Sequence, residues 1–168
     1  MICELINPKT KDYFQLKEII LSNYFNWNWD DATTTGDGDD FPFLNHCVLR
    51  RPMESGYLYP LPECNFAPKF NFVIGEIIDA NNLKVNSLLR INCNLTFPCG
   101  ENKKTPPHFD HPFPHKNILF YLNDTDGDTV CEGERSTPAE DKIILFEGEH
   151  YQYLPSKNKR VVIVVTFS

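Results

Sequence analysis

The chain contains 168 residues, of which 41% are hydrophobic and 13% aromatic, and it carries a formal net charge of −7. This length is sufficient for one domain with a buried core, and the negative charge argues against a general nucleic-acid-binding protein, which would need a basic face. No apolar run approaches the length of a membrane span, so we expect no membrane association.

The cysteines and the N-terminus both bear on the cellular compartment. The six cysteines include no C-x-x-C pair. The first residues, MICELINPKTKDYF, lack the basic region followed by an apolar region that marks a signal peptide. Because disulfides are rare in reducing compartments, we expect a cytoplasmic protein whose thiols are reduced and mostly buried.

The first predicted element is a helix over about residues 11–23. In the segment KDYFQLKEIILSNYF, four large apolar side chains recur at roughly helical spacing: Phe14, Ile19, Ile20 and Tyr24. Just beyond it, Trp27 and Trp29 alternate. They would form either a substrate lip or, as we prefer, part of the core or an interface, because Trp is often buried without a catalytic role.

An acidic segment, WDDATTTGDGDDF, follows with five Asp residues. We expect a solvated loop at about residues 30–40, which is open to basic partners. A calcium role is disfavoured because the acids lack the alternating spacing of a calcium loop. Residues 41–66 carry several prolines, which fits short strands and turns.

A second helix is predicted over about residues 68–82. The segment opens with Pro and ends with Asn-Asn, as helices often do. Five apolar side chains share one face and would pack on a sheet: Phe70, Val73, Ile74, Ile77 and Ile78.

From about residue 85 the pattern changes to short apolar runs rich in β-branched residues, namely VNSLLRINCNLTF, HKNILFYLND, DKIILFEG and RVVIVVTF. Turn segments such as DTDGD and LPSKNK separate them, and no helix-length periodic segment remains. Two helices followed by seven or eight strands predict a β-sandwich or barrel with helices on one face. We expect one domain, residues 1–168, with mixed helical support over about 1–84 and the β core over about 85–168.

The segment TPPHFDHPFPHKNILFYLND holds three of the chain's five histidines. On an extended strand, residues i and i+2 point to the same side. His108 and Asp110 would therefore present an imidazole and a carboxylate to a common point. His111 and His115 are four residues apart, but the prolines between them exclude a helix that would join them as ligands. We expect these two to face solvent or to lie behind the ligands.

His150 and Arg160 are the further candidate site residues: His150 would add a second imidazole to the His108 and Asp110 pair, and Arg160 would add a positive charge. Two histidines and one carboxylate on one face of an octahedron, with three positions open, is the arrangement of non-haem Fe(II) oxygenases. A bidentate Arg160 suits the distal carboxylate of an oxo-diacid co-substrate. We expect a β-hairpin around YQYLPSKNK with residue 152 opposite 160, because a one-residue slip would turn Arg160 outward.

The order and spacing of these motifs resemble the 2-oxoglutarate/Fe(II) dioxygenase superfamily, in particular its prolyl-4-hydroxylase-like branch in the compact form met in phage and marine sequences. The similarity covers about residues 88–167. It consists of H-x-D, an apolar strand ending in FYLN, a Gly turn DGDT, and a histidine followed ten residues later by a basic residue. It implies a mostly β protein with a double-stranded β-helix, also called a jelly-roll or cupin-like fold, and supporting N-terminal helices.

The resemblance also implies roles for particular residues. His108, Asp110 and His150 would be the Fe(II) ligands. Arg160 would bind the C5 carboxylate of 2-oxoglutarate, and Tyr121 would place its hydroxyl on the same carboxylate. The implied reaction uses O2 to hydroxylate a C–H bond of a peptidyl residue, such as proline, or of a small molecule, with release of succinate and CO2.

Two departures and two alternatives accompany this hypothesis. The turn has one glycine, Gly127, where many relatives have two, and Glu147 and Glu149 add negative charge near the last ligand. One alternative is a non-enzymatic jelly-roll binding or structural module, and the other is a metal-binding cupin-like enzyme that does not use 2-oxoglutarate. Arg90 and Arg135 would contact substrate only if their strands line the mouth of the barrel.

Overall fold

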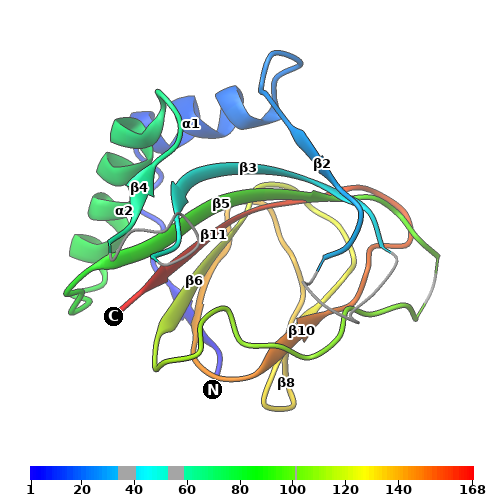
Figure 1. Cartoon of the computed structure of the whole chain (residues 1–168). Helices are drawn as coiled ribbons and strands as arrows, with labels where there is room; N and C mark the ends of the chain where they lie inside the picture. The colour runs from blue at the N-terminus through cyan, green and yellow to red at the C-terminus, as the bar shows by residue number, and fades with distance from the viewer. Residues whose placement is uncertain (34–40, 53–58, 101) are drawn as a thin grey trace.

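The structure is a computed structural model that describes residues 1–33, 41–52, 59–100 and 102–168. Most of the predicted acidic loop, residues 34–40, lies outside the described residues. The described chain forms two antiparallel sheets that face each other, with both helices on the outer side of the larger one (Figure 1).

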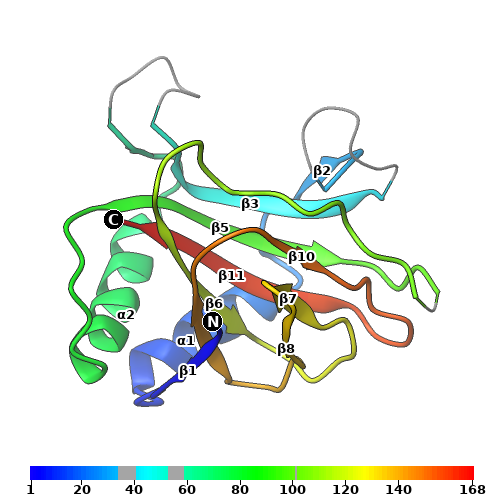
Figure 2. The same cartoon turned by 90° about the horizontal axis from the view of Figure 1, so that it is seen from below.

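The larger sheet has eight strands in the order β1-β9-β6-β11-β5-β3-β2, with β4 paired to β3. The smaller has three, in the order β10-β7-β8, and it lies in front of the large sheet in Figure 2. The strands span Cys3–Leu5 (β1), Asn28–Asp30 (β2), Phe43–Arg50 (β3), Leu61–Pro62 (β4), Leu88–Thr96 (β5), Lys116–Tyr121 (β6), Thr129–Cys131 (β7), Glu134–Ser136 (β8), Ile143–Phe146 (β9), His150–Gln152 (β10) and Arg160–Phe167 (β11).

The expected fold class is confirmed: a mostly β jelly-roll supported by N-terminal helices. Residues before 84 supply both helices and also strands β1 to β4, so they build part of the large sheet as well as its cover. From residue 85 onward the described chain holds seven strands and no helix, as the apolar runs predict.

Helix α1 spans Lys11–Leu21. It begins where the Thr10 side chain accepts a hydrogen bond from the backbone N–H of Tyr13, a common N-cap arrangement. Its buried face consists of Tyr13, Leu16, Lys17 and Ile20. Of the side chains that suggested the helix, Phe14 is 41% exposed and Tyr24 lies beyond the end, so the helix was predicted correctly from a partly wrong face.

Helix α2 spans Ala67–Ala80, with Pro68 in its first turn. Four of the five predicted apolar residues are buried and Ile78 is half-buried. With 11 and 14 residues, neither described helix is long and apolar enough to cross a membrane.

Successive side chains of β5 point alternately to the hydrophobic core beneath the helices and to the cavity between the two sheets. Ile91, Cys93 and Leu95 belong to the hydrophobic core that includes both helices. The intervening Asn92, Asn94 and Thr96 line a cavity between the two sheets. Since strand residues alternate between faces, one strand contributes both the core and the polar wall of the cavity. All six cysteines are free, with Cys93 and Cys131 buried and Cys3 exposed.

A buried ion pair attaches α1 to the segment before β9. Lys17 Nζ lies 2.5 Å from Glu140 Oε1 and 2.5 Å from Asp141 Oδ1, and its side chain is only 10% exposed. We expect Lys17→Met to destabilise the protein by about 2–3 kcal/mol, because removing one partner leaves a carboxylate uncompensated. Urea unfolding of the variant beside exposed Lys84→Met measures this, and equal stability of the two would contradict the assignment.

The same contact makes stability pH-dependent. Burial alone would raise the pKa of Asp141, but hydrogen bonds from Lys17 and Tyr13 outweigh it and hold the pKa below its ordinary value. A lowered pKa in the folded state adds stability above the unfolded pKa of about 4, and this stability is lost as the pH falls further. We expect the melting temperature to drop less between pH 6 and pH 3 for Asp141→Asn than for the native chain.

Candidate active site

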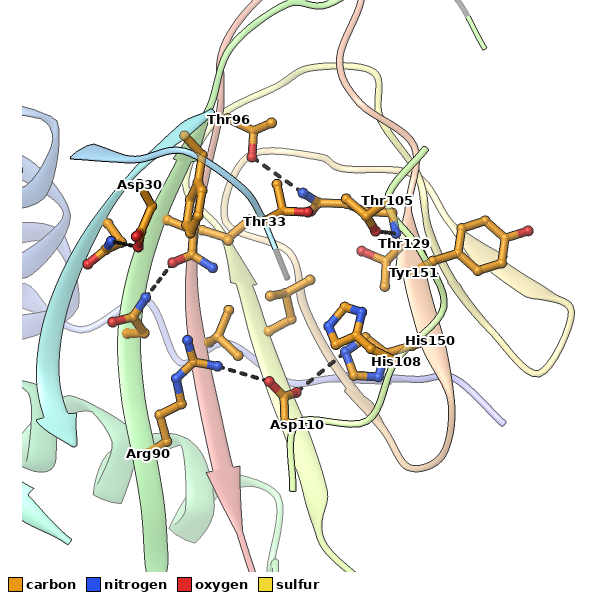
Figure 3. Close-up of a pocket in the computed structure, with 18 of the residues that line it drawn as sticks. Asp30, Thr33, Arg90, Thr96, Thr105, His108, Asp110, Thr129, His150 and Tyr151 are labelled. Carbon is orange, nitrogen blue, oxygen red and sulfur yellow. Dashed lines mark hydrogen bonds and ion pairs between the residues drawn. The ribbon is translucent and has the colours of Figure 1, made fainter. Parts of the chain in front are cut away.

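His108 and His150 are brought together by backbone pairing. The His108 N–H donates to the His150 carbonyl at 2.9 Å and the His150 N–H to the His108 carbonyl at 3.0 Å, an antiparallel bridge. Their ring centroids are 4.5 Å apart. Asp110 follows two residues after this bridge and turns toward both rings (Figure 3).

The three side chains converge on one point. One ligand atom from each of His108, Asp110 and His150 lies within 4.8 Å of the others. Asp110 Oδ2 is 3.4 Å from His150 Nε2. The sequence placed His150 about 40 residues from the H-x-D pair, and the structure brings them together. Their role as metal ligands stays a prediction.

Hydrogen bonds to backbone carbonyls fix both imidazole rings. His108 Nδ1 lies 3.0 Å from the Pro106 carbonyl oxygen, and His150 Nδ1 lies 3.1 Å from that of Gly148. A carbonyl only accepts, so each Nδ1 carries the proton and each Nε2 has a free lone pair. This is the outer hydrogen bonding found around metal-ligating histidines.

Asp110 is held on one side only. Arg90 Nη1 donates to Oδ1 at 2.9 Å, and Arg51 Nη1 donates to the backbone carbonyl of Asp110 at 3.0 Å. The other carboxylate oxygen, Oδ2, is buried with no hydrogen-bond partner among the described residues. A buried anionic oxygen without a partner is costly, and a cation at this point would satisfy it.

Protonation states at the site suit a divalent cation. Burial and the neighbouring His150 lower the pKa of His108, which favours the neutral ring. Burial would raise the pKa of Asp110, but the adjacent His150 ring and the charge of Arg90 hold this pKa below its ordinary value. Neutral imidazoles and an ionised carboxylate are the forms that bind metal.

Arg160 lines the same cavity as His108, Asp110 and His150. The volume of this cavity is about 490 Å³. The Arg160 side chain is buried, Nη2 donates to Thr129 Oγ1 at 2.9 Å, and Nη1 contacts Gln152 Oε1. Figure 3 shows Thr96, Thr105 and Thr129 at one end of the cavity and Arg90 with Asp110 at the other. A buried guanidinium beside hydroxyl groups is suited to bind a carboxylate.

The predicted hairpin between β10 and β11 is wrong. Strand β10 pairs with β7 in the small sheet, whereas β11 pairs with β5 and β6 in the large sheet. The segment between them crosses from one sheet to the other, so no hairpin register relates His150 to Arg160. Both side chains point inward because the two sheets face each other.

Tyr121 lies behind Arg160 and does not line the cavity. Its hydroxyl donates to Thr129 Oγ1 at 2.8 Å, and its ring lies 5.4 Å from the Arg160 guanidinium carbon. Its expected contact with a co-substrate carboxylate stays a prediction. Thr129 is the shared neighbour that faces the cavity, and sequence reasoning missed it and Gln152, since both lie on strands of three residues.

Of the two positions expected for His111 and His115, facing solvent or lying behind the ligands, the structure excludes the first, because both residues are buried. His111 Nε2 lies 2.7 Å from Thr166 Oγ1, and the two rings are 4.7 Å apart. Burial, together with His115 and Arg51, lowers the pKa of His111 to about 4. The intervening prolines exclude a helix as predicted, and neither ring joins the cluster of three.

The tryptophans before the acidic segment differ in environment. Trp27 is half-buried and packs edge-on against Phe25 with ring centroids 4.9 Å apart. Trp29 is 60% exposed and lies near Phe97, with ring centroids 6.4 Å apart. The neighbouring Asp30 and Thr33 line the cavity, so the start of the acidic segment contributes to its wall.

Comparisons with known proteins identify the fold. No protein-family model matches the chain, and a search of curated proteins finds no match. Among solved structures, a 2OG-Fe(II) oxygenase family oxidoreductase from Burkholderia pseudomallei superposes with a TM-score of 0.60 at 14% identity, over 85% of this chain and 73% of that one. A prolyl hydroxylase from Trichoplax adhaerens, in complex with a peptide fragment of hypoxia inducible factor, gives 0.60 at 13% identity, over 99% and 82%.

A third neighbour carries a different chemistry on the same architecture. The non-haem α-ketoglutarate-dependent epimerase SnoN from nogalamycin biosynthesis gives a TM-score of 0.57 at 12% identity, over 99% of this chain and 77% of that one. The chain therefore has the fold of the 2-oxoglutarate/Fe(II) oxygenases, which confirms the predicted resemblance to them and to their prolyl hydroxylases. A fold alone does not decide a reaction.

Proposed function

We propose that this protein is an Fe(II)- and 2-oxoglutarate-dependent oxygenase that hydroxylates a C–H bond of a peptide, protein or small-molecule substrate. One oxygen atom of O2 enters the substrate C–H bond and the other enters succinate, while 2-oxoglutarate loses CO2. The observation that carries this proposal is the convergence of two imidazoles and a carboxylate in the cavity that also holds a buried arginine.

The three donor groups fit iron. Two Nε2 lone pairs and one carboxylate oxygen would hold the ion, and Arg90 keeps the second oxygen of Asp110 engaged. An octahedral ion would then retain three open positions for co-substrate and O2. When bound, Fe(II) would supply the O2-activating redox chemistry, and the protein supplies position and exclusion of water.

The remaining cavity residues suit 2-oxoglutarate. Arg160 and Thr129 would receive its C5 carboxylate, displacing the Gln152 side-chain contact. The cavity lining also includes Val162 and Leu119, whose apolar side chains would suit the two methylene groups. The inward Arg160 favours this function over a cupin-like enzyme without 2-oxoglutarate, because such an enzyme has no co-substrate carboxylate for a buried cavity arginine to bind.

The test is turnover of 2-oxoglutarate. Purified protein supplied with Fe(II) and 2-oxoglutarate in air should release succinate above a metal-free control, even without substrate. Chelation should stop succinate release and lower the melting temperature. Absence of both succinate and bound metal would favour the non-enzymatic jelly-roll module.

Arg90 is expected to be a positioning residue for Asp110. We expect Arg90→Met to weaken Fe(II) binding by about 10–100-fold, the usual effect of removing an outer partner of a metal ligand. Arg90→Lys should recover part of this affinity because it keeps a donor. Anaerobic calorimetric titration with Fe(II) measures the effect, and unchanged affinity in Arg90→Met would contradict it.

A further inference from the structure

The cavity floor on the large sheet has two chemically different halves. One half is apolar and comes from β6, β9 and β11: Leu119, Phe146, Val162 and Val164. The other half comes from β3 and β5, which contribute Phe43 and Cys47 together with a larger set of polar residues. We call this set the polar half: Asn45, Asn92, Asn94, Thr96, Arg50 and Arg90. Because these strands are neighbours in one sheet, the change in chemistry occurs across the floor of a single cavity.

Three amides form the centre of the polar half. Asn45 pairs with Asn94 across β3 and β5, and Asn92 is two residues further along the same face. Asn92 Nδ2 donates to Asn94 Oδ1, and Asn45 Nδ2 donates to Asp30 Oδ2. Each amide offers two N–H donors and one carbonyl acceptor, so these two bonds leave several donors and acceptors facing the cavity.

Arginine is concentrated around this cavity. Of the chain's five arginines, four line it, and none of its eleven lysines does. Arg90 uses Nη1 for Asp110, and Arg50 Nε lies 2.8 Å from Glu63 Oε1. A guanidinium has five N–H groups, so both retain donors, and arginine is preferred over lysine where carboxylates are bound in a planar fork.

Arg50 and Arg90 also lie at the same end of the floor. Leu49 pairs with Ile91, which places Arg50 and Arg90 next to each other on adjacent strands. Each guanidinium already contacts one carboxylate, that of Glu63 for Arg50 and that of Asp110 for Arg90. A substrate anion would therefore bind through their remaining N–H groups.

We propose that the primary substrate carries a carboxylate on a polar, hydrogen-bonding framework, and that it lies on the polar half with this carboxylate toward Arg50 and Arg90. The inference rests on the proposed oxygenase function and narrows its substrate class. An unsubstituted prolyl ring is a poor match for the polar half. The ring would displace the water bound to the amide groups and offer no hydrogen bonds in its place. The shared chemistry is a carboxylate, supplied either by a free amino acid or by an acidic side chain of a peptide.

The test is a probe panel on the full chain loaded anaerobically with Mn(II) and 2-oxoglutarate. The probes are the free proteinogenic amino acids, blocked peptides with a central Asp or Glu, their Asn and Gln counterparts, and a blocked prolyl peptide. Binding is followed by thermal shift and calorimetry, and aerobic Fe(II) reactions are checked for a mass gain of one oxygen atom. The free and peptide arms distinguish the two sources of the carboxylate.

At least one acidic probe should bind about ten-fold or more tightly than its amide counterpart, as expected for a charge pair inside a cavity. Asn94→Leu and Arg50→Gln should each weaken that binding by about ten-fold. The matched controls, Asn71→Leu on the exposed face of α2 and Arg135→Gln outside the cavity, should leave it unchanged. Arg50→Lys keeps the charge and shows whether the planar fork matters.

The proposal is overturned if no acid in the panel binds, or if the prolyl peptide or the neutral amides bind as well as the acids. Succinate release by the native protein without any probe is recorded in parallel. If that release is present while every acid fails, the substrate inference is wrong and the oxygenase function stands. If that release is absent, the function itself is wrong.

Discussion

Replacing Asp110 with Ala is expected to lower Fe(II) affinity by about 100-fold or more, since even outer partners of metal ligands are worth 10–100-fold. Asp110 contributes the only carboxylate of the converging set, and its Oδ2 lacks a hydrogen-bond partner among the described residues. Without it, two imidazoles remain beside Arg90, whose charge repels a cation. Anaerobic calorimetry with Fe(II) measures the loss.

Two further variants show whether the loss of Fe(II) affinity is specific to the Asp110 carboxylate. Asp79→Ala removes an exposed carboxylate from α2 and should leave Fe(II) affinity unchanged. Asp110→Asn keeps the shape of the side chain but not its charge, and it should lose most of the affinity while the protein remains folded. Fe(II) bound as tightly by both Asp110 variants as by the native chain would place the metal elsewhere.

Replacing Arg160 with Leu is expected to raise the Kd for 2-oxoglutarate by about 100-fold, because losing one member of a buried charge pair typically costs 2–5 kcal/mol. Fe(II) affinity should stay within about two-fold of native, since the metal ligands lie on other segments. The measurement is an anaerobic titration of the Fe(II)-loaded protein with 2-oxoglutarate.

The matched control is Arg135→Leu. Arg135 donates to the Tyr153 hydroxyl at 2.9 Å and does not line the cavity, so this variant should bind 2-oxoglutarate normally. Arg160→Lys should lie between native and Arg160→Leu, because it retains the charge without the bidentate fork. Equal weakening by the Arg135 and Arg160 variants would argue against a specific carboxylate site.

Sequence reasoning succeeded where a local pattern decides the structure. The apolar periodicity of α2 marks four residues that are buried, and the β-branched runs after residue 85 become strands of the jelly-roll. His108 and Asp110 lie near one point, as their i, i+2 spacing predicts. This prediction depends only on the local backbone and not on distant contacts. These features require no knowledge of distant contacts.

Sequence reasoning failed where strands that are distant in the sequence, and that belong to different sheets, come to face each other. The segment YQYLPSKNK predicts a hairpin between His150 and Arg160, but the chain crosses between the two sheets at that point. Lys17 on the buried face of α1 was missed because its partners, Glu140 and Asp141, lie more than 120 residues away. The polar half of the cavity floor also escaped notice, since β3 and β5 meet only in the folded sheet.

The central claim is that one cation and 2-oxoglutarate bind together at the converging His108, Asp110 and His150. Its most direct test is visible absorption of the anaerobic protein with one equivalent of Fe(II), titrated with 2-oxoglutarate. We predict a weak charge-transfer band that saturates at one equivalent and is absent from the Asp110→Ala variant. A native protein that binds Fe(II) but develops no band, or a band that survives in Asp110→Ala, would contradict the account.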